Sequence, residues 1–304
     1  MAESIPPYIT ACPVGCGAPL TPAEIVLPEG PLRRCTACGQ LLSQIDEPAY
    51  LQSMRQFDRQ QFNLPAPHEL ERRFKVARRR LSRISALLKR PPAAIRMLDV
   101  GCSRGGFLAA GARLGFRMEG VEPAPSMAAA ARAQGLTAHT GLLEDIGFAA
   151  ASFDAVTLFE VIEHLKEPLA LLRECRRVLK PGGLLVLSTG NTASWTVAAM
   201  RGRWDYFHIA RDGGHISFYN PRSIELLASR SGFAVELIKT ARVRFHEQGD
   251  VVRWRYVAGK LAAELLNLPA RLAGRGHDML VFLRAKNCLT ASITASTSAS
   301  LMPK

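Results

Sequence analysis

The sequence lacks an uncharged apolar run long enough to cross a membrane, which takes about 20 residues. Its first residues also lack the basic segment followed by an apolar run that is typical of a secretory signal. No membrane-spanning helix is therefore expected, and we expect a cytoplasmic protein. Hydrophobic residues make up 48% of the 304 residues and charged residues 21%, which is ordinary for a globular chain.

Acidic residues are in short supply. The chain has 26 Asp and Glu against 39 Lys and Arg, a formal net charge of +13. Such a charge favours anionic partners: nucleic acid, nucleotide-linked or phosphorylated substrates, or an acidic membrane surface. Much of the excess is arginine, which a GC-rich genome would also produce, so charge alone selects no partner.

The composition divides the chain into four segments. Residues 1–45 are rich in Pro, Gly and Cys and show no helical period. Residues 46–90 contain a connector and a basic amphipathic helix expected over 69–90, where apolar residues such as Leu70, Phe74 and Leu81 recur at helical spacing. Residues 91–286 form the main domain, and the Ser/Thr/Ala-rich residues 287–304 are expected to be disordered.

Strand and helix patterns alternate through the main domain. Strands are expected over residues 95–100, 117–122, 138–140, 153–159, 184–189, 233–240 and 278–285. Helices are expected over 106–115, 125–134, 168–179 and 221–231, and an insertion at 246–276 has a helical pattern. This order predicts an α/β fold with a mostly parallel sheet covered by helices on both faces.

A glycine-rich turn follows the first of these strands, in Leu98-Asp-Val-Gly-Cys-Ser-Arg-Gly105. Gly101 and Gly105 would let backbone N–H groups approach a ligand. Glu122 ends the next strand, where a carboxylate can bind ribose hydroxyls. A dinucleotide-binding domain has the same layout, but Ser103 replaces its middle glycine and Asp99 would repel a pyrophosphate. The acid suits a cationic cofactor without phosphate, such as S-adenosylmethionine.

Five blocks in order carry a resemblance to a known family: the glycine turn, Gly120-Val-Glu-Pro123, Ser152-Phe-Asp-Ala-Val156, Phe159-Glu-Val-Ile-Glu-His-Leu165 and Leu179-Lys-Pro-Gly-Gly183. Over residues 70–285 the chain resembles class I S-adenosylmethionine-dependent methyltransferases, in the group that contains the ubiquinone-biosynthesis O-methyltransferases. The resemblance implies a Rossmann-like, seven-stranded sheet whose last strand is antiparallel.

The resemblance also implies a cofactor site. Asp99 and the turn would hold the amino-acid part of S-adenosylmethionine, and Glu122 its ribose. Leu142 and Leu143 stand where the family often has an acid that contacts adenine, so apolar packing is expected there instead. The full set of expected cofactor residues is Asp99, Gly101, Cys102, Ser103, Gly105, Glu122, Leu142, Leu143, Phe159 and Glu160.

Glu160, Glu163 and His164 form the pattern E-x-x-E-H, and His215 lies further along the chain. If the chain curls into a helix after the strand, the first three share one face. Two carboxylates and two imidazoles can bind a divalent cation, as a similar pattern does in small-RNA 2′-O-methyltransferases. Alternatively the acids cap a helix start, and His164 or His215, with Glu163, acts as a general base.

Four cysteines in the first segment have the spacing of metal ligands. Cys12 and Cys16 are separated by three residues, Cys35 and Cys38 by two, and a glycine follows each pair. Four thiolates satisfy tetrahedral zinc, and a disulfide is the poorer explanation in a cytosolic chain. The pattern predicts a small structural zinc ribbon.

The acceptor side of the site is expected in the loop after the strand at 184–189, because such loops lie over the carboxyl edge of the sheet. The candidates there are Trp195, Trp204, Tyr206, His208 and Arg211, with packing of the loop on itself as the alternative. In the insertion, Trp254, Leu261 and Leu265 recur at helical spacing beside basic residues. This suits a lid, a dimer face or an interfacial membrane helix.

Three functions follow from these patterns. The leading hypothesis is an S-adenosylmethionine-dependent methyltransferase that acts on an oxygen or carbon of a small-molecule acceptor linked to a sugar, a quinone or a lipid. The second is an RNA methyltransferase that grips RNA with the zinc ribbon and the basic helix. The third is a non-catalytic regulator that binds the cofactor.

Overall fold

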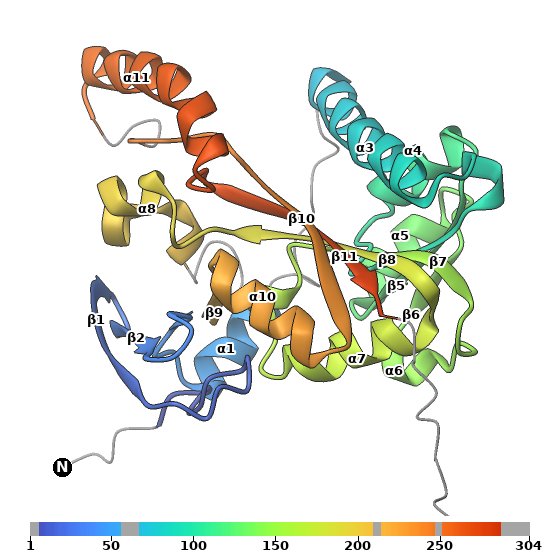
Figure 1. The fold of residues 1–304 in the computed structure, drawn as a ribbon, viewed down its shortest axis with the longest axis horizontal. Helices are drawn as coiled ribbons and strands as arrows, with labels where there is room; N and C mark the ends of the chain where they lie inside the picture. Colours follow the sequence, from blue (N-terminus) through green and yellow to red (C-terminus); the bar gives the residue numbers. More distant parts are fainter. Residues whose placement is uncertain (1–5, 56–66, 209–213, 247–250, 287–304) are drawn as a thin grey trace, which may run out of the picture.

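The computed structural model describes residues 6–55, 67–208, 214–246 and 251–286, and its main element is a seven-stranded sheet (Figure 1). The strand order is β10-β11-β8-β7-β4-β5-β6. Its strands are β4 (Arg96–Val100), β5 (Arg117–Glu122), β6 (Ala138–Thr140), β7 (Phe153–Phe159), β8 (Leu179–Gly190), β10 (Phe233–Ala241) and β11 (Asp278–Ala285). Only β11 runs against its neighbours, β8 and β10, within this sheet. The predicted mostly parallel sheet with an antiparallel last strand is confirmed.

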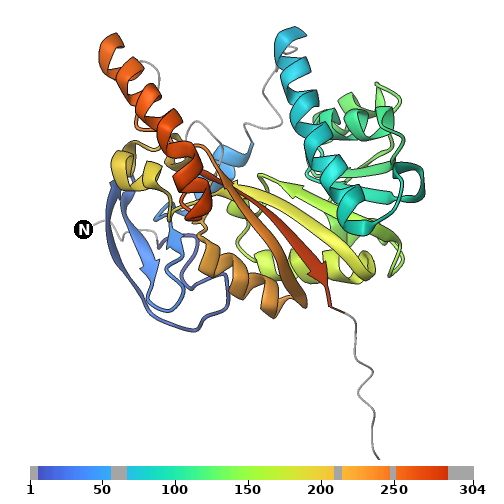
Figure 2. The same ribbon diagram turned by 45° about the horizontal axis from the view of Figure 1, so that its top comes forward.

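Helices cover both faces of this sheet (Figures 1 and 2). On one face α3 (Pro67–Leu88) packs Leu81 and Ile84 against Met97 and Val186 of the strands, beside α4 (Gly106–Arg113). On the other, α7 (Pro168–Val178) and α10 (Pro221–Arg230) pack Leu172 and other apolar residues against the opposite strand faces. The near-continuous apolar strands β7 and β8 follow from this, because helices cover both sides.

The remaining elements are shorter or lie at the edges. They are α1 (Glu47–Met54), α5 (Pro125–Arg132), α6 (Leu143–Ile146), α8 (Trp195–Met200) and α11 (Arg253–Leu272), with 3-10 turns η1 (Pro92–Ala94), η2 (Ile162–His164), η3 (Arg201–Arg203) and η4 (Asp205–Phe207). The expected helical insertion is α11. β8 begins at Leu179, earlier than predicted, because Leu179 already pairs with Phe153 of β7.

A second, four-stranded sheet contains the first segment of the chain, in the order β1-β2-β3-β9. Its strands are β1 (Leu20–Leu27), β2 (Gly30–Cys35), β3 (Leu41–Leu42) and β9 (Ser217–Phe218). The edge strand β9 comes from the main part of the chain, and it pairs antiparallel with β3. The cysteine-bearing segment is therefore joined to the rest of the protein by backbone hydrogen bonds.

The chain contains no membrane-spanning candidate in the part that the structure describes: none of those helices is long and apolar enough. The predicted disordered tail, residues 287–304, and Arg211 lie outside the described residues.

Candidate functional site

Asp99 lies buried near the carboxyl end of the central strand β4, with only 4% of its surface exposed. Its Oδ1 accepts a hydrogen bond of 2.5 Å from the Thr157 hydroxyl on the neighbouring strand β7. Burial raises the pKa of Asp99 to about 7, while Thr157 and the charge of Arg80 act in the opposite direction. A buried acid that titrates near neutrality and lies beside a glycine turn is a candidate binding group for a cation.

The glycine turn has the conformation that the sequence predicts. Gly101 and Gly105 have φ angles of +76° and +79°, in the left-handed region. A Cβ on Gly101 would lie 2.7 Å from a Val161 methyl, and one on Gly105 would lie 2.5 Å from a Leu136 methyl. Ser103 also has a positive φ, of 49°, which a bulkier side chain would adopt at a cost.

Four backbone N–H groups of the turn donate hydrogen bonds inside the protein. Those of Gly101 and Cys102 donate to the carbonyl of Val121, and that of Gly105 donates to Cys102. The Ser103 N–H donates to Glu122 Oε2 at 2.8 Å. These bonds hold the end of β4 against the end of β5, so the turn positions the two acids. The Cys102 side chain is buried against Leu108, in the core.

Glu122 lies at the end of β5 and is 8% exposed. Its second oxygen accepts from the N–H of Ala124 at 3.0 Å, so two backbone donors fix the orientation of the carboxylate. Burial raises the pKa of Glu122, and these two hydrogen bonds lower it. Of the two leucines expected near adenine, Leu142 is half exposed and Leu143 is buried in the core. Leu142 alone presents its side chain to the surface.

Arg80 is a site residue that the sequence pattern hid. It lies on α3, and its guanidinium carbon is 4.3 Å from the centre of the Phe159 ring. Burial lowers the pKa of Arg80, and the charges of Glu160, Asp278 and Asp99 raise it. Its charge therefore faces the acids at the carboxyl edge of the sheet. In the sequence, position 80 lies next to Leu81, which the helical period predicts to be buried. This was the signal in the sequence that could have identified Arg80.

Glu163, His164 and His215 come together just beyond the end of β7. One ligand atom from each lies within 4.8 Å of the others, a spacing that could hold a metal ion. Glu163 and His164 belong to the 3-10 turn η2, and His215 precedes β9. The centres of the two imidazole rings are 4.7 Å apart. The chain therefore brings together three of the four residues that the sequence proposed for a divalent cation.

Neighbouring groups orient this cluster. His215 Nδ1 lies 2.8 Å from the Tyr206 carbonyl oxygen. A carbonyl can only accept, so Nδ1 carries the proton of this hydrogen bond, and a metal ion or a proton would bind at Nε2. The Tyr206 hydroxyl donates to Glu163 Oε1 at 2.6 Å, and Thr189 donates to Oε2 at 3.2 Å. Glu163 is fully buried, and burial together with the charge of Glu160 raises its pKa well above the ordinary value.

Glu160 lies outside the three-residue cluster. It is exposed, with a φ of +55°, and its carboxylate accepts hydrogen bonds from Ser188 at 2.6 Å and from Tyr206 at 3.2 Å. The left-handed backbone at a non-glycine residue is a local strain of the kind found at functional sites. The predicted single helix face is wrong, because the chain makes this left-handed turn before η2 begins. The Glu160 carboxylate instead contacts Ser188 of β8 and the Tyr206 hydroxyl.

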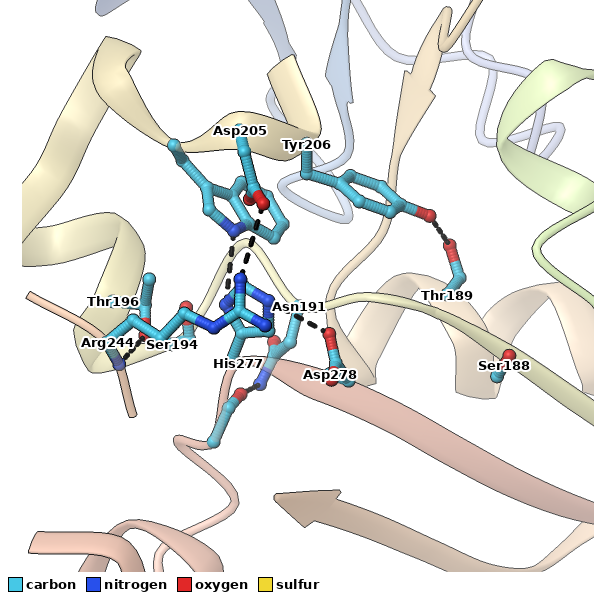
Figure 3. A network of polar contacts seen from close by, with 12 residues as sticks. Ser188, Thr189, Asn191, Ser194, Thr196, Asp205, Tyr206, Arg244, His277 and Asp278 are labelled. Atoms are coloured by element: carbon cyan, nitrogen blue, oxygen red, sulfur yellow. Dashed lines mark hydrogen bonds and ion pairs between the residues drawn. The ribbon is translucent and has the colours of Figure 1, made fainter. Parts of the chain in front are cut away.

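The loop expected to contact the acceptor divides into two groups. Tyr206 reaches the site, where its hydroxyl also lies 3.0 Å from the Thr189 hydroxyl (Figure 3). Trp204 is fully buried in an apolar cluster and stacks on Tyr206, so it presents no surface to an acceptor. Trp195 is half-buried and packs near α11 through Val243 and Ala263, and His208 is exposed.

Behind Tyr206 lies a polar network that the sequence did not reveal (Figure 3). The indole N–H of Trp204 donates to His277 Nδ1 at 3.1 Å, and His277 Nε2 lies 3.2 Å from Asp278 Oδ1. Burial, aided by the charge of Arg244, lowers the pKa of His277 to about 4, so the ring is neutral. Arg244 pairs with Asp205 at 3.3 Å. The network fixes the loop that carries Tyr206.

The four cysteines of the first segment lie together. Their sulfur atoms are all within 4.8 Å of one another, and the sulfurs of Cys12 and Cys38 are 3.6 Å apart. Tetrahedral zinc with Zn–S bonds of about 2.3 Å would separate its ligands by roughly 3.8 Å. The arrangement fits the predicted zinc ribbon.

The cysteine cluster is connected to the histidine cluster through β9. The Cys38 carbonyl accepts from the Asn220 side chain at 3.2 Å, and the Ile216 carbonyl accepts from the Ser43 N–H at 3.0 Å. The Ile216 N–H in turn donates to the Glu163 carbonyl at 2.9 Å. From α1, the Tyr50 hydroxyl donates to the His164 carbonyl at 2.8 Å. The first segment therefore reaches the cluster through Ile216, and α1 contacts the cluster backbone directly.

Comparisons with known proteins identify similar sequences. A ubiquinone biosynthesis O-methyltransferase of Xanthomonas axonopodis pv. citri is 41% identical over 119 residues, which are 37% of this chain and 49% of that protein. Its counterpart in Cereibacter sphaeroides is 40% identical over 118 residues, 36% of this chain and 48% of that protein. The chain thus spans about half the length of the curated relatives it matches.

Among solved structures, the fold is similar to an SAM-dependent methyltransferase from Archaeoglobus fulgidus. The TM-score is 0.48 and the identity 17%, over 68% of this chain and 94% of that one. The methyltransferase-domain family matches residues 69–238, which is more than half of the chain. On this match, the chain belongs to the methyltransferase-domain family.

Proposed function

We propose that this protein transfers a methyl group from S-adenosylmethionine to an oxygen of a small-molecule acceptor. The observation that carries the proposal is the placement of two separate sets of groups along one edge of the sheet. Asp99 and Glu122 lie at the carboxyl ends of neighbouring strands. Glu163 and His164 follow β7, the other neighbour of β4, and His215 lies beside them. One set suits the cofactor, and the other suits the acidic hydrogen of an acceptor.

The cofactor set fits S-adenosylmethionine by its chemistry. Asp99 is a buried carboxylate suited to a cationic amino group, and Glu122 is an oriented carboxylate suited to the ribose hydroxyls. Arg80 brings a positive charge to the same edge, suited to a carboxylate. When bound, S-adenosylmethionine supplies a methyl group on a positively charged sulfur, and the protein's contribution is to align acceptor and donor.

The acceptor set would remove the proton of the acceptor hydroxyl or stabilise the negative charge that forms on its oxygen. His215 would act as a base through Nε2, because Nδ1 donates to the Tyr206 carbonyl. The same three residues would hold a divalent cation, which would lower the pKa of an acceptor hydroxyl. Glu160 lies near enough to Glu163 for their charges to interact.

For the acceptor itself we propose a quinone-type phenol or catechol. The support is the name of the relatives, ubiquinone biosynthesis O-methyltransferase, together with a cluster that suits adjacent hydroxyls. Such acceptors are lipid-linked, so peripheral contact with a membrane belongs to the same proposal. A cytoplasmic location is proposed as well, because thiols stay reduced there and can bind zinc.

Three measurements test the proposal. Calorimetry should detect binding of S-adenosylmethionine and of S-adenosylhomocysteine, and Asp99→Asn should weaken it strongly. Incubation with a catechol acceptor should release S-adenosylhomocysteine, and Glu163→Gln should slow this at least about 100-fold while cofactor binding persists. Methylation of RNA but of no phenol would favour an RNA methyltransferase. Cofactor binding without turnover of phenols, sugars, lipids or RNA would favour a regulator.

A further inference from the structure

The helix α11 carries large apolar side chains on its outer surface. Five of them are 62–80% exposed, and they follow one another at spacings of three, four or seven residues: Trp254, Leu261, Leu265, Leu268 and Leu272. With 3.6 residues per turn, this spacing aligns them in one stripe along the helix. An apolar stripe of this length on a protein surface marks a site of contact with another apolar surface.

The opposite side of α11 already has its partner within the protein. Ala263 and Ala270 are buried against Val243, with Trp195 and Phe245 beside them. The Val243 N–H donates to the Asn267 side chain at 2.8 Å, which fixes the helix to the segment after β10. The buried side of α11 therefore holds the helix against the rest of the protein, and the outer stripe is not needed for this contact.

Basic residues lie beside the stripe. Arg253, Arg255, Lys260 and Arg271 are exposed, and Glu264 is the single acidic residue of this fully described helix. In a pair of identical α11 helices these like charges would face one another. An anionic surface would instead be attracted by them while the apolar stripe is buried.

A second basic helix projects on the same side. In both views α3 and α11 rise from the same side of the large sheet (Figures 1 and 2). Exposed positive charges on α3 include Arg72, Arg73, Lys75, Arg78 and Arg79. Between the two helices, Lys239 of β10 has a pKa lowered by burial and by the charges of Arg83 on α3 and Arg271 on α11. The positive field thus extends from one helix to the other.

We propose that α11 binds the surface of an anionic lipid bilayer, with its apolar stripe in the acyl boundary and its basic residues among the headgroups. α3 adds positive charge on the same side. The stripe lies in the plane of the membrane rather than across it. This proposal concerns where the protein binds and does not depend on the identity of the methyl acceptor.

Sedimentation with lipid vesicles tests it. The intact chain should bind vesicles of phosphatidylcholine with 30% phosphatidylglycerol at least tenfold more tightly than pure phosphatidylcholine, and about 0.5 M NaCl should remove most of this preference. The triple variant Leu261→Gln/Leu265→Gln/Leu268→Gln should lose at least tenfold in vesicle affinity. The matched control, Val26→Gln/Leu51→Gln, removes exposed apolar side chains elsewhere and should bind like the wild type.

Fluorescence gives a second readout that does not depend on the triple variant folding. Tryptophan emission should shift to shorter wavelength on anionic vesicles. Trp254→Phe should remove that shift, because Trp204 is already buried and Trp195 packs under α11. Light scattering tests the alternative, in which a second copy of this chain covers the stripe. If the wild type is a dimer that the triple variant converts to a monomer, and neither binds vesicles, the stripe is an interface between two copies and the proposal is overturned. Unchanged vesicle binding by the triple variant would overturn it too.

Discussion

Leu42 of the cysteine-bearing segment pairs with Ser217, two residues after His215. The adjoining residues continue the connection, because Ser43 donates to the carbonyl of Ile216, whose N–H donates to Glu163. Two residues of the proposed acceptor site are therefore held by a strand that the cysteine segment completes. A short strand of two residues cannot hold its place without the sheet beside it.

Removal of zinc should therefore damage the acceptor site and spare the cofactor site. After chelation, we expect kcat for methyl transfer to fall at least about tenfold, because β9 loses its fixed partner. The Kd for S-adenosylmethionine should stay within about threefold, since Asp99 and Glu122 belong to the seven-stranded sheet and β9 to the four-stranded one. Activity assays and calorimetry on the same chelated sample measure the two quantities.

The Tyr50→Phe variant separates this connection from general unfolding. It removes one hydrogen bond, from the Tyr50 hydroxyl to the His164 carbonyl, and leaves all four cysteines in place. A several-fold loss of kcat with zinc content and cofactor affinity unchanged is expected. Full activity in the zinc-free protein, with its cysteines shown to be metal-free, would refute the coupling.

The sequence predicted the large sheet well because its strands are long apolar runs separated by helical periods. It also placed Asp99 and Glu122 correctly, since both end strands that pair in parallel. It did not predict the elements that depend on long-range contacts. β3 and β9 are only two residues long, and they pair although they lie far apart in the sequence. Arg80 and His277 were missed for a similar reason, because neither lies in a motif and both acquire their roles from residues far away in the sequence.

Cofactor affinity should depend on pH through Asp99. Its pKa is about 7 in the ligand-free protein, and a cationic amino group needs the ionised carboxylate. We expect affinity to be constant above about pH 8 and to fall roughly tenfold per unit below about pH 6.5. Because the folded pKa is raised, the ligand-free protein should lose stability from this group as pH rises from about 4 to about 7. Calorimetry across this range measures the first effect, and urea unfolding the second.

Variants of Asp99, Arg80 and Glu122 test whether Asp99 is the group whose ionisation sets the pH dependence of cofactor affinity. Arg80 lowers the pKa of Asp99 by its charge, so Arg80→Gln should move the midpoint of the affinity profile to higher pH. Glu122 acts in the opposite direction, and Glu122→Gln should move the midpoint down. Asp99→Asn should bind weakly with a flat profile. A wild-type affinity that stays constant between about pH 5.5 and pH 8 would show that Asp99 does not bind the cation.

Tyr206 should act through Glu163 rather than on the cofactor. Its hydroxyl donates a hydrogen bond of 2.6 Å to the buried Glu163, so Tyr206→Phe leaves one carboxylate oxygen without that donor. We expect kcat to fall about 10- to 100-fold and the pKa seen in the kcat profile to rise, because the hydrogen bond lowers the pKa of Glu163. Cofactor affinity should be unchanged. His208→Ala, an exposed residue of the same loop, is the matched control and should keep the wild-type profile if it does not contact the acceptor.

A variant of Trp204 tests whether this residue packs in the core or contacts the acceptor. Its side chain is fully buried, stacks on Tyr206 and donates to His277, so Trp204→Phe leaves a cavity and removes the donor to a neutral imidazole. The free energy of unfolding should fall by about 2–4 kcal/mol, as measured by urea denaturation. Trp254→Phe, at a residue that is 68% exposed, should change it by less than about 0.5 kcal/mol. If Trp204 contacted the acceptor instead, KM would rise in the variant while stability stayed close to the wild type, the reverse of the expected pattern.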